Sequence, residues 1–141
     1  MAKTFGAQVH QIIRRNSALM TMVAQESTQR LIHIVQTPKG KGGKLPLDTG
    51  FLRASGRTSY TGMPTGPVRG RDREEGEAGE IYSAPAAVTL AGFKLGTAVF
   101  FGWTAIYARR QNLYSGFLDS GIRQWQKIVD GVVRDLRNRL R

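Results

Sequence analysis

Few side chains in this sequence have the types and spacing that catalysis or metal binding requires. There is no cysteine, so a disulfide framework, a thiolate zinc site and a cysteine nucleophile are excluded. His10 and His33 lie too far apart in the sequence to form a local metal motif. The acidic run 74–80 lacks the ligand spacing of a calcium loop, and no Ser-His-Asp arrangement or nucleophile elbow is recognisable. We therefore expect no enzyme activity, no bound metal and no cofactor.

The segment from Lys39 to Lys44 alternates lysines with glycines and invites comparison with a phosphate-binding loop. Such a loop places its glycines between a strand and the N-terminus of a helix, and it ends in Gly-Lys-Ser or Gly-Lys-Thr. Here a predicted helix precedes the glycines, and Pro46 follows them. We therefore interpret segment 38–47 as a mobile, cationic surface loop that becomes ordered on assembly.

Asp48 has a structural interpretation that needs no ligand. Its carboxylate is placed to accept a hydrogen bond from the amide of Phe51 and so to cap a short helix over 49–54. On this helix Phe51 and Leu52 are predicted to be buried, and Arg53 is predicted to face solvent. A general-base role for Asp48 has no support, because no histidine or second carboxylate lies nearby in the sequence.

A long helix is predicted at the start of the chain, from about residue 7 to residue 36. Its apolar residues recur with helical spacing, and Thr37-Pro38 ends it because the residue before proline avoids the α region. A helix of this length runs about 45 Å at 1.5 Å per residue, so part of it is expected to project from so small a domain. The apolar pattern weakens around Asn16 and Ser27, which leaves open an alternative with a break.

A second helix is predicted from Gly116 to Arg139, with one apolar face that includes Trp125 as a core residue. Arginines gather in its last turn, where they complement the negative end of the helix dipole. The predicted apolar face consists of Ile122, Trp125, Val129, Val132, Val133, Leu136 and Leu140.

The middle of the chain is predicted to form a small sheet. β-Branched and aromatic residues favour strands at 57–61, 81–82, 87–90 and 97–101, whereas 62–79 combines glycines, prolines and charges and is interpreted as a long exposed loop. The fold class is therefore α+β: a long N-terminal helix and a C-terminal helix packed on a small, mainly antiparallel β-sheet with long loops. The chain is treated as a single domain, 1–141, whose parts are 1–37, 38–47, 48–103 and 104–141.

The charge of the chain indicates the kind of partner. Lys and Arg number 21 against 10 Asp and Glu, and the resulting net charge of +11 favours an anionic partner. One proline, three glycines and a lysine interrupt the apolar stretch 84–103, so we expect no membrane partner. One functional alternative is a small basic nucleic-acid-binding protein that acts as a monomer or dimer, although no helix-turn-helix or ribonucleoprotein signature is visible. A weaker alternative is a hydrolase of unknown type, which needs a pocket with perturbed titratable groups.

Two short elements carry a family resemblance. Asp48-Thr49-Gly50 is followed by Leu52-Arg53 and Ser55, and near the last helix Tyr107-Ala108 is followed by Gly116-Phe117-Leu118. The chain resembles the minor tail protein Z-like family of tail-completion (neck) proteins of long-tailed phages. That family commonly has an acidic-Phe-Gly step after the Tyr-Ala pair. Arg109-Arg110-Gln111-Asn112 stands there instead, so the chain resembles a divergent member.

The resemblance implies a structural virion protein: a tail-terminator-like subunit of a closed ring that joins the head connector to the tail tube. Six-fold symmetry is carried over from the family. The implied partners are copies of the chain itself, head-closure or connector proteins, tail-tube proteins and packaged DNA in the lumen of the ring. The subunit would be assembled in the cytoplasm of the bacterial host and located in the neck of the virion. The candidate contact residues are Lys39, Lys41, Lys44, Arg69, Arg71, Arg73, Trp103, Arg109 and Arg110.

Overall fold

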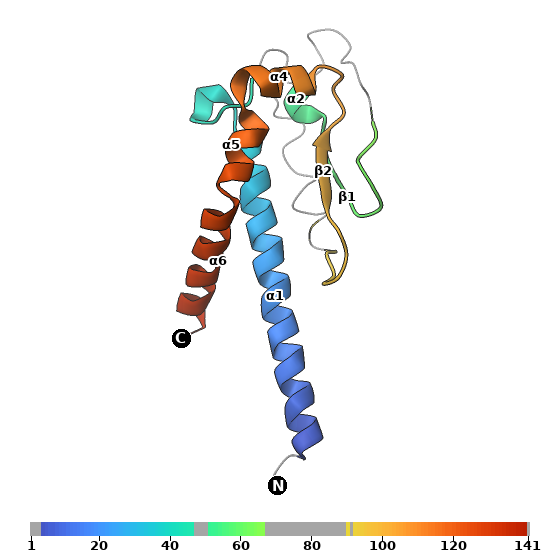
Figure 1. The fold of residues 1–141 in the computed structure, drawn as a ribbon, viewed down its shortest axis with the longest axis vertical. Helices are drawn as coiled ribbons and strands as arrows, with labels where there is room; N and C mark the ends of the chain where they lie inside the picture. The colour runs from blue at the N-terminus through green and yellow to red at the C-terminus, as the bar shows by residue number, and fades with distance from the viewer. Residues whose placement is uncertain (1–3, 47–50, 67–89, 91, 141) are drawn as a thin grey trace.

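The first helix is the longest element of the fold. The computed structural model describes residues 4–46, 51–66, 90 and 92–140. Helix α1 (Phe5–Val35) has 31 residues, and its N-terminal part projects beyond the rest of the molecule, as predicted (Figure 1). The helix continues through Asn16 and Ser27, since both residue types cost less than about 0.7 kcal/mol in a helix interior. Thr4 caps it by accepting a hydrogen bond from the amide of Ala7 at 3.2 Å.

The predicted C-terminal helix is two helices, α5 (Phe117–Arg123) and α6 (Trp125–Arg139), which meet at Gln124. Helix α5 packs on the C-terminal end of α1, where a Cβ atom on Gly121 would collide with the side chain of Val35. Helix α6 then runs alongside α1 in the opposite direction (Figure 1).

The buried face of α6 agrees only in part with the predicted one, since Val132 and Leu136 were predicted to be buried and Ile128 was not. Ile128, Val132 and Leu136 are buried, whereas Ile122 and Leu140 are exposed and Trp125 is 40% exposed. The prediction of Trp125 as a core residue is therefore wrong. The break at Gln124 interrupts the helical periodicity from which a single continuous face was inferred.

The sheet has two strands in the part of the chain that the structure describes. Strand β1 (Gly56–Ser59) pairs antiparallel with β2 (Phe100–Trp103), with Gly56 opposite Trp103. Strand β2 starts later than predicted, because a turn closed by the hydrogen bond from Thr97 N–H to the carbonyl of Lys94 precedes it. The strand predicted at 81–82 and residues 87–89 of the strand predicted at 87–90 lie outside the described residues, as does most of the loop 62–79. The remaining residue of that prediction, Leu90, is helical, so the strand does not extend to it. The α+β class is confirmed.

The lysine–glycine segment, which was predicted to be a mobile surface loop, forms a compact turn. A short 3-10 helix, η1 (Lys39–Lys41), is followed by Gly42 with φ 87°. The amide of Lys39 donates to the carbonyl of Leu45 at 3.0 Å, and the amide of Leu45 donates to the carbonyl of Thr37 at 3.2 Å. Leu45 is completely buried. Its burial and these backbone hydrogen bonds order a segment that composition alone assigned to a mobile loop.

Candidate functional site

The residues of the two sequence elements come together in one cluster, which we call the motif junction. Its buried members are Leu45, Leu52, Ala105 and Phe117. The partly buried side chains packed against them are Phe51, Trp103, Tyr107, Ala108 and Leu118. Leu52 belongs to the short helix α2 (Phe51–Ala54), and Ala108 begins helix α4 (Ala108–Ser115). The junction lies at the end of the molecule opposite the N-terminus of α1 (Figure 1).

Ser55 connects the two elements directly. Its side chain is 2% exposed, and its hydroxyl donates to the carbonyl of Leu52 at 2.8 Å. The same oxygen accepts a hydrogen bond from the amide of Ala105 at 3.2 Å, and the amide of Thr104 donates to the carbonyl of Ser55. The serine of the first element therefore binds the backbone that leads into the second.

Gln36, at the end of α1, ties the helix to both elements. Its side-chain amide donates to the carbonyl of Arg53 at 3.0 Å, and its side-chain oxygen accepts from the indole N–H of Trp103 at 2.8 Å. Arg53 Nε donates in return to the carbonyl of Gln36 at 3.0 Å, so the prediction that Arg53 faces solvent is wrong. This guanidinium satisfies a carbonyl at a helix C-terminus, where cations are favoured. No sequence signal distinguishes Gln36 from the other glutamines.

Aromatic contacts complete the junction. The ring of Trp103 meets the rings of Phe117 and Phe101 edge-on, with centroids 4.8 Å and 5.1 Å apart. A second contact between the two elements is made by the rings of Phe51 and Tyr107, whose centroids are 6.5 Å apart. Because Trp103 uses both its N–H and its ring within the chain, it is a structural residue of the junction.

The Arg109–Asn112 segment, where the second element departs from the family pattern, makes its own hydrogen bonds to the next helix. Asn112 Oδ1 accepts hydrogen bonds from the amides of Leu118 at 3.0 Å and Asp119 at 3.3 Å, and it thereby caps the first turn of α5. Gly116 joins α4 to α5 with φ 67°, a left-handed conformation that favours glycine. The Arg109–Asn112 segment is thus part of a capped helix pair.

The candidate contact residues divide into three groups. Lys39, Lys41, Lys44, Arg109 and Arg110 are exposed, and η1 and α4, which carry most of them, lie at the junction end of the molecule (Figure 1). Trp103 is half-buried in the junction. The remaining candidates, Arg69, Arg71 and Arg73, lie outside the described residues, as do Asp48, Thr49 and Gly50 of the first element.

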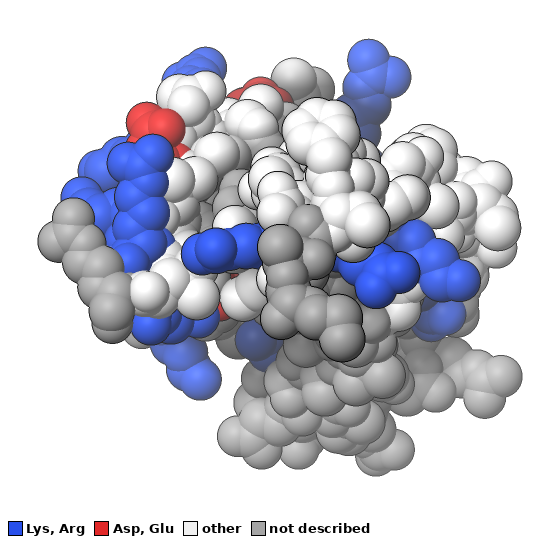
Figure 2. Space-filling view, turned by 90° about the horizontal axis from the view of Figure 1, so that it is seen from below, with Lys and Arg blue, Asp and Glu red and all other residues white. Residues whose placement is uncertain are grey.

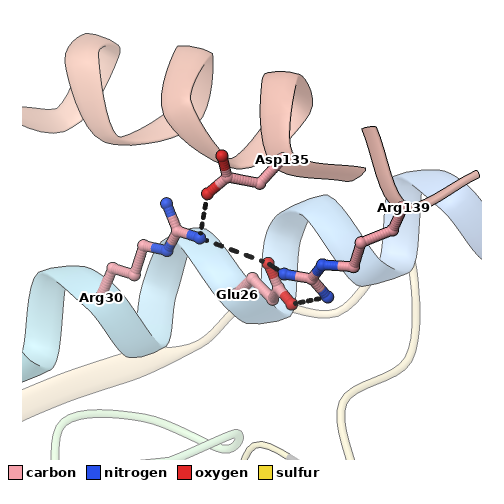
Figure 3. Close-up of polar contacts among 4 residues, drawn as sticks. All are labelled: Glu26, Arg30, Asp135 and Arg139. Carbon is pink, nitrogen blue, oxygen red and sulfur yellow. Dashed lines mark hydrogen bonds and ion pairs between the residues drawn. The ribbon is translucent and has the colours of Figure 1, made fainter. Parts of the chain in front are cut away.

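A charged network fastens α6 to α1 (Figure 3). Arg30 Nη2 lies 2.8 Å from Asp135 Oδ2 and 3.8 Å from Glu26 Oε2, and Arg139 Nη1 lies 2.9 Å from Glu26 Oε1. The hydrogen bond from Arg30 holds the pKa of the Asp135 carboxyl below its ordinary value, and Glu26 raises the pKa of Arg139. An open groove of about 970 Å³ adjoins the network, with His33, Lys127 and Arg134 in its lining. The acidic groups of the network are paired with arginines, so none is placed as a free base.

Neither metal binding nor membrane spanning is indicated by the described residues. Among them, no group of three or more His, Asp or Glu is placed to hold a metal ion. No helix in the described part of the chain is long and apolar enough to cross a membrane.

Comparisons with known proteins give no family assignment. No protein-family model matches the chain, and neither curated proteins nor solved structures include a match.

Proposed function

We propose that this chain is a neck or tail-completion subunit of a long-tailed phage, and that it works in a ring that joins the head connector to the tail tube. The supporting observation is the motif junction. Ser55 and Ala105 lie 50 positions apart in the sequence, and their hydrogen bond joins the first element to the backbone that leads into the second. A shared structural purpose of the two elements requires contacts of this kind.

The chemistry of the junction favours a scaffold over a catalytic site. The hydroxyl of Ser55, the side chain of Gln36 and the indole of Trp103 all bond within the chain. A nucleophile or general base must instead be available to a substrate. The junction therefore holds η1 and α4 in place and so positions their exposed lysines and arginines.

A ring built from this subunit has to balance its charge. Each copy contributes +11, so neighbouring copies repel one another unless acidic protein surfaces or DNA lie between or beside them. Contacts between copies in a closed ring are heterologous, which means that two different patches of each subunit meet. The exposed cations at the junction end supply one such patch, directed at an acidic neighbour in the neck.

The test uses a phage genome that encodes this chain, with an early stop codon placed in the gene. Electron microscopy of the lysate is expected to show filled heads beside unjoined tails. Normal, joined and infectious particles would refute the proposal. Complementation of the stop-codon mutant with variants of the gene then locates the contact with the neighbouring neck protein. The variant Arg109→Glu with Arg110→Glu is expected not to restore the joining of heads and tails. The control Lys127→Glu with Arg137→Glu makes the same charge change on α6 and is expected to restore it.

The competing function is DNA binding by the isolated chain. Exposed basic side chains on α6, such as Arg134 and Arg137, give this alternative its support. A DNA-binding protein that neutralises several phosphates loses affinity steeply with salt, with a logarithmic slope of about −0.9 per phosphate. Under the neck proposal, titration of the purified chain with duplex DNA shows only weak binding at physiological salt. Tight, steeply salt-dependent binding, together with normal particles from the stop-codon mutant, would favour the alternative.

A further inference from the structure

The N-terminal part of α1 carries an apolar surface that nothing in the described structure covers. Helix α6 ends where Arg139 binds Glu26, so residues 5–22 of α1, which we call the arm, extend past it (Figure 1). On the arm Phe5 is 81% exposed, Ile12 59%, Ile13 56% and Met20 59%. Figure 2 views the molecule from this end and shows a broad uncharged area with Lys and Arg side chains around it.

The apolar surface of the arm continues the line along which α6 binds. Alternating steps of four and three residues connect the positions Phe5, Val9, Ile12, Asn16, Leu19, Val23, Glu26 and Arg30. Residues with this spacing share one face of a helix and form the seam of helix pairs. The last two positions, Glu26 and Arg30, already bind α6. The same face therefore accepts α6 from Glu26 onward, and its positions before Glu26 have the pattern for another helix.

The charges of the arm indicate which charged side chains a helix bound to it should have. In the contact between α1 and α6, Arg30 of α1 pairs with Asp135 of α6, and Glu26 of α1 pairs with Arg139 of α6. The sequence has no Asp or Glu before Glu26, whereas Arg14 and Arg15 lie in the middle of the arm. The arm supplies only cations, so carboxylates have to come from the partner.

A second copy of the arm fits this surface poorly. In an antiparallel pair the middle of one arm lies against the middle of the other, which brings Arg15, beside the seam residue Asn16, close to its own copy. In a parallel pair the neighbouring helix would run into α6, because α6 occupies the same face from Glu26 onward. Charge and geometry both favour a different molecule.

We propose that the arm is a docking surface for an amphipathic helix of another protein, one whose apolar stripe is flanked by Asp and Glu. This interaction surface goes beyond the proposed neck function and holds whether or not the chain belongs to a phage. It is a helix-on-helix contact in which apolar burial supplies the affinity and the flanking carboxylates supply the selectivity.

The probe is a fluorescein-labelled peptide with the α6 sequence and the four changes Lys127→Glu, Arg134→Glu, Arg137→Glu and Arg139→Glu. The control peptide has the unaltered α6 sequence. Fluorescence anisotropy with the full chain is expected to show saturable binding of the acidic peptide, at least about tenfold tighter than that of the basic one. Equal binding of the two peptides, or no saturation up to roughly 200 µM protein, would overturn the proposal.

Two variants separate docking on the arm from general attraction to a basic protein. Ile12→Glu with Ile13→Glu is expected to weaken binding of the acidic peptide at least about tenfold. The matched control, Leu113→Glu with Tyr114→Glu on α4, also replaces two exposed apolar side chains by carboxylates, and it should bind within about twofold of the wild type. Unchanged binding by the arm variant contradicts the proposal. Sedimentation of the wild type as an oligomer that Ile12→Glu with Ile13→Glu dissociates would show that the occupant is a second copy, and would also overturn it.

Discussion

Two buried serines are expected to respond to the same substitution with opposite signs. Ser55 and Ser27 are 2% and 0% exposed. The Ser55 hydroxyl bonds the carbonyl of Leu52 and the amide of Ala105, whereas the Ser27 hydroxyl has no hydrogen-bond partner among the described residues. We expect Ser55→Ala to lower the free energy of unfolding and Ser27→Ala to raise it.

The size of each change in the free energy of unfolding depends on which groups lose a hydrogen-bond partner. In Ser55→Ala the carbonyl of Leu52 keeps a hydrogen bond from the amide of residue 55, but the buried amide of Ala105 loses its acceptor. An unsatisfied buried donor costs about 1–3 kcal/mol, so we expect a loss of about 2 kcal/mol. Ser27→Ala removes a hydroxyl whose unpaired burial costs about 1–3 kcal/mol and improves helix propensity by about 0.5 kcal/mol. Because single stabilising substitutions commonly contribute no more than about 2 kcal/mol, we expect the low end of these contributions, a gain of about 1–2 kcal/mol.

Urea unfolding followed by circular dichroism measures both changes. Ser115→Ala is the control, because this half-buried serine donates only to the carbonyl of Gln111 within its own helix; a change below about 0.5 kcal/mol is expected. The two buried-serine variants should differ by about 3 kcal/mol, or roughly 10 °C in melting temperature. Equal losses at both positions would refute the hydrogen-bond assignments, and an unchanged Ser55→Ala variant would refute the role of Ser55 in the junction.

Two further predictions concern the packing of the helices. Gly121→Ala is expected to lower the free energy of unfolding by about 1–3 kcal/mol, because its Cβ would collide with Val35. Gly131→Ala should raise it by up to about 1 kcal/mol, since the added Cβ would lie 3.5 Å from Arg30 Nη1 and collide with no atom of the described residues; similar melting temperatures for the two variants would contradict the α1–α5 contact. The folded-state pKa of Asp135 is depressed, so its contribution to stability is present above the unfolded value of about 4 and is lost as pH falls through the lower folded value. Urea midpoints below about pH 4 should therefore fall more steeply in the wild type than in Asp135→Asn; identical slopes would exclude this ion pair as a source of the pH dependence.

Helical periodicity predicted the elements of this fold better than their contacts. Apolar residues recur with helical spacing over most of α1, despite the weaker pattern around Asn16 and Ser27, so the helix and its projection were predictable. The same method placed Trp125 in the core, because periodicity carries no information about the break at Gln124. Which face of a helix is buried depends on where its axis changes direction, and that is decided by tertiary packing.

The polar contacts of the junction could not be predicted from the sequence, for a different reason. The side-chain amide of a glutamine such as Gln36 has two N–H donors and one acceptor oxygen. Its hydrogen-bond partners depend on which segments the fold places beside it. Arg53 was expected in solvent because of its charge, yet a carbonyl at the end of α1 gives it a favourable inward position. Composition likewise predicted disorder for the lysine–glycine turn, since it weighs charge and glycine content but not the burial of Leu45 that follows them.

The two proposed surfaces lie at opposite ends of α1, and this separation bears on how the subunit would work. The arm is apolar and cationic, and the junction end is cationic, so neither surface complements the other in charge. Among the described residues, a heterologous contact made by pressing the arm of one copy onto the junction end of the next would therefore bring mostly cations together, with Asp119 of α5 as a carboxylate near the junction. An acidic protein placed between successive copies, or in an adjacent ring, would satisfy both surfaces together. On this reasoning the proposed ring would close only in the presence of an acidic partner, and we expect the isolated chain to stay monomeric at concentrations at which an assembled neck would be stable.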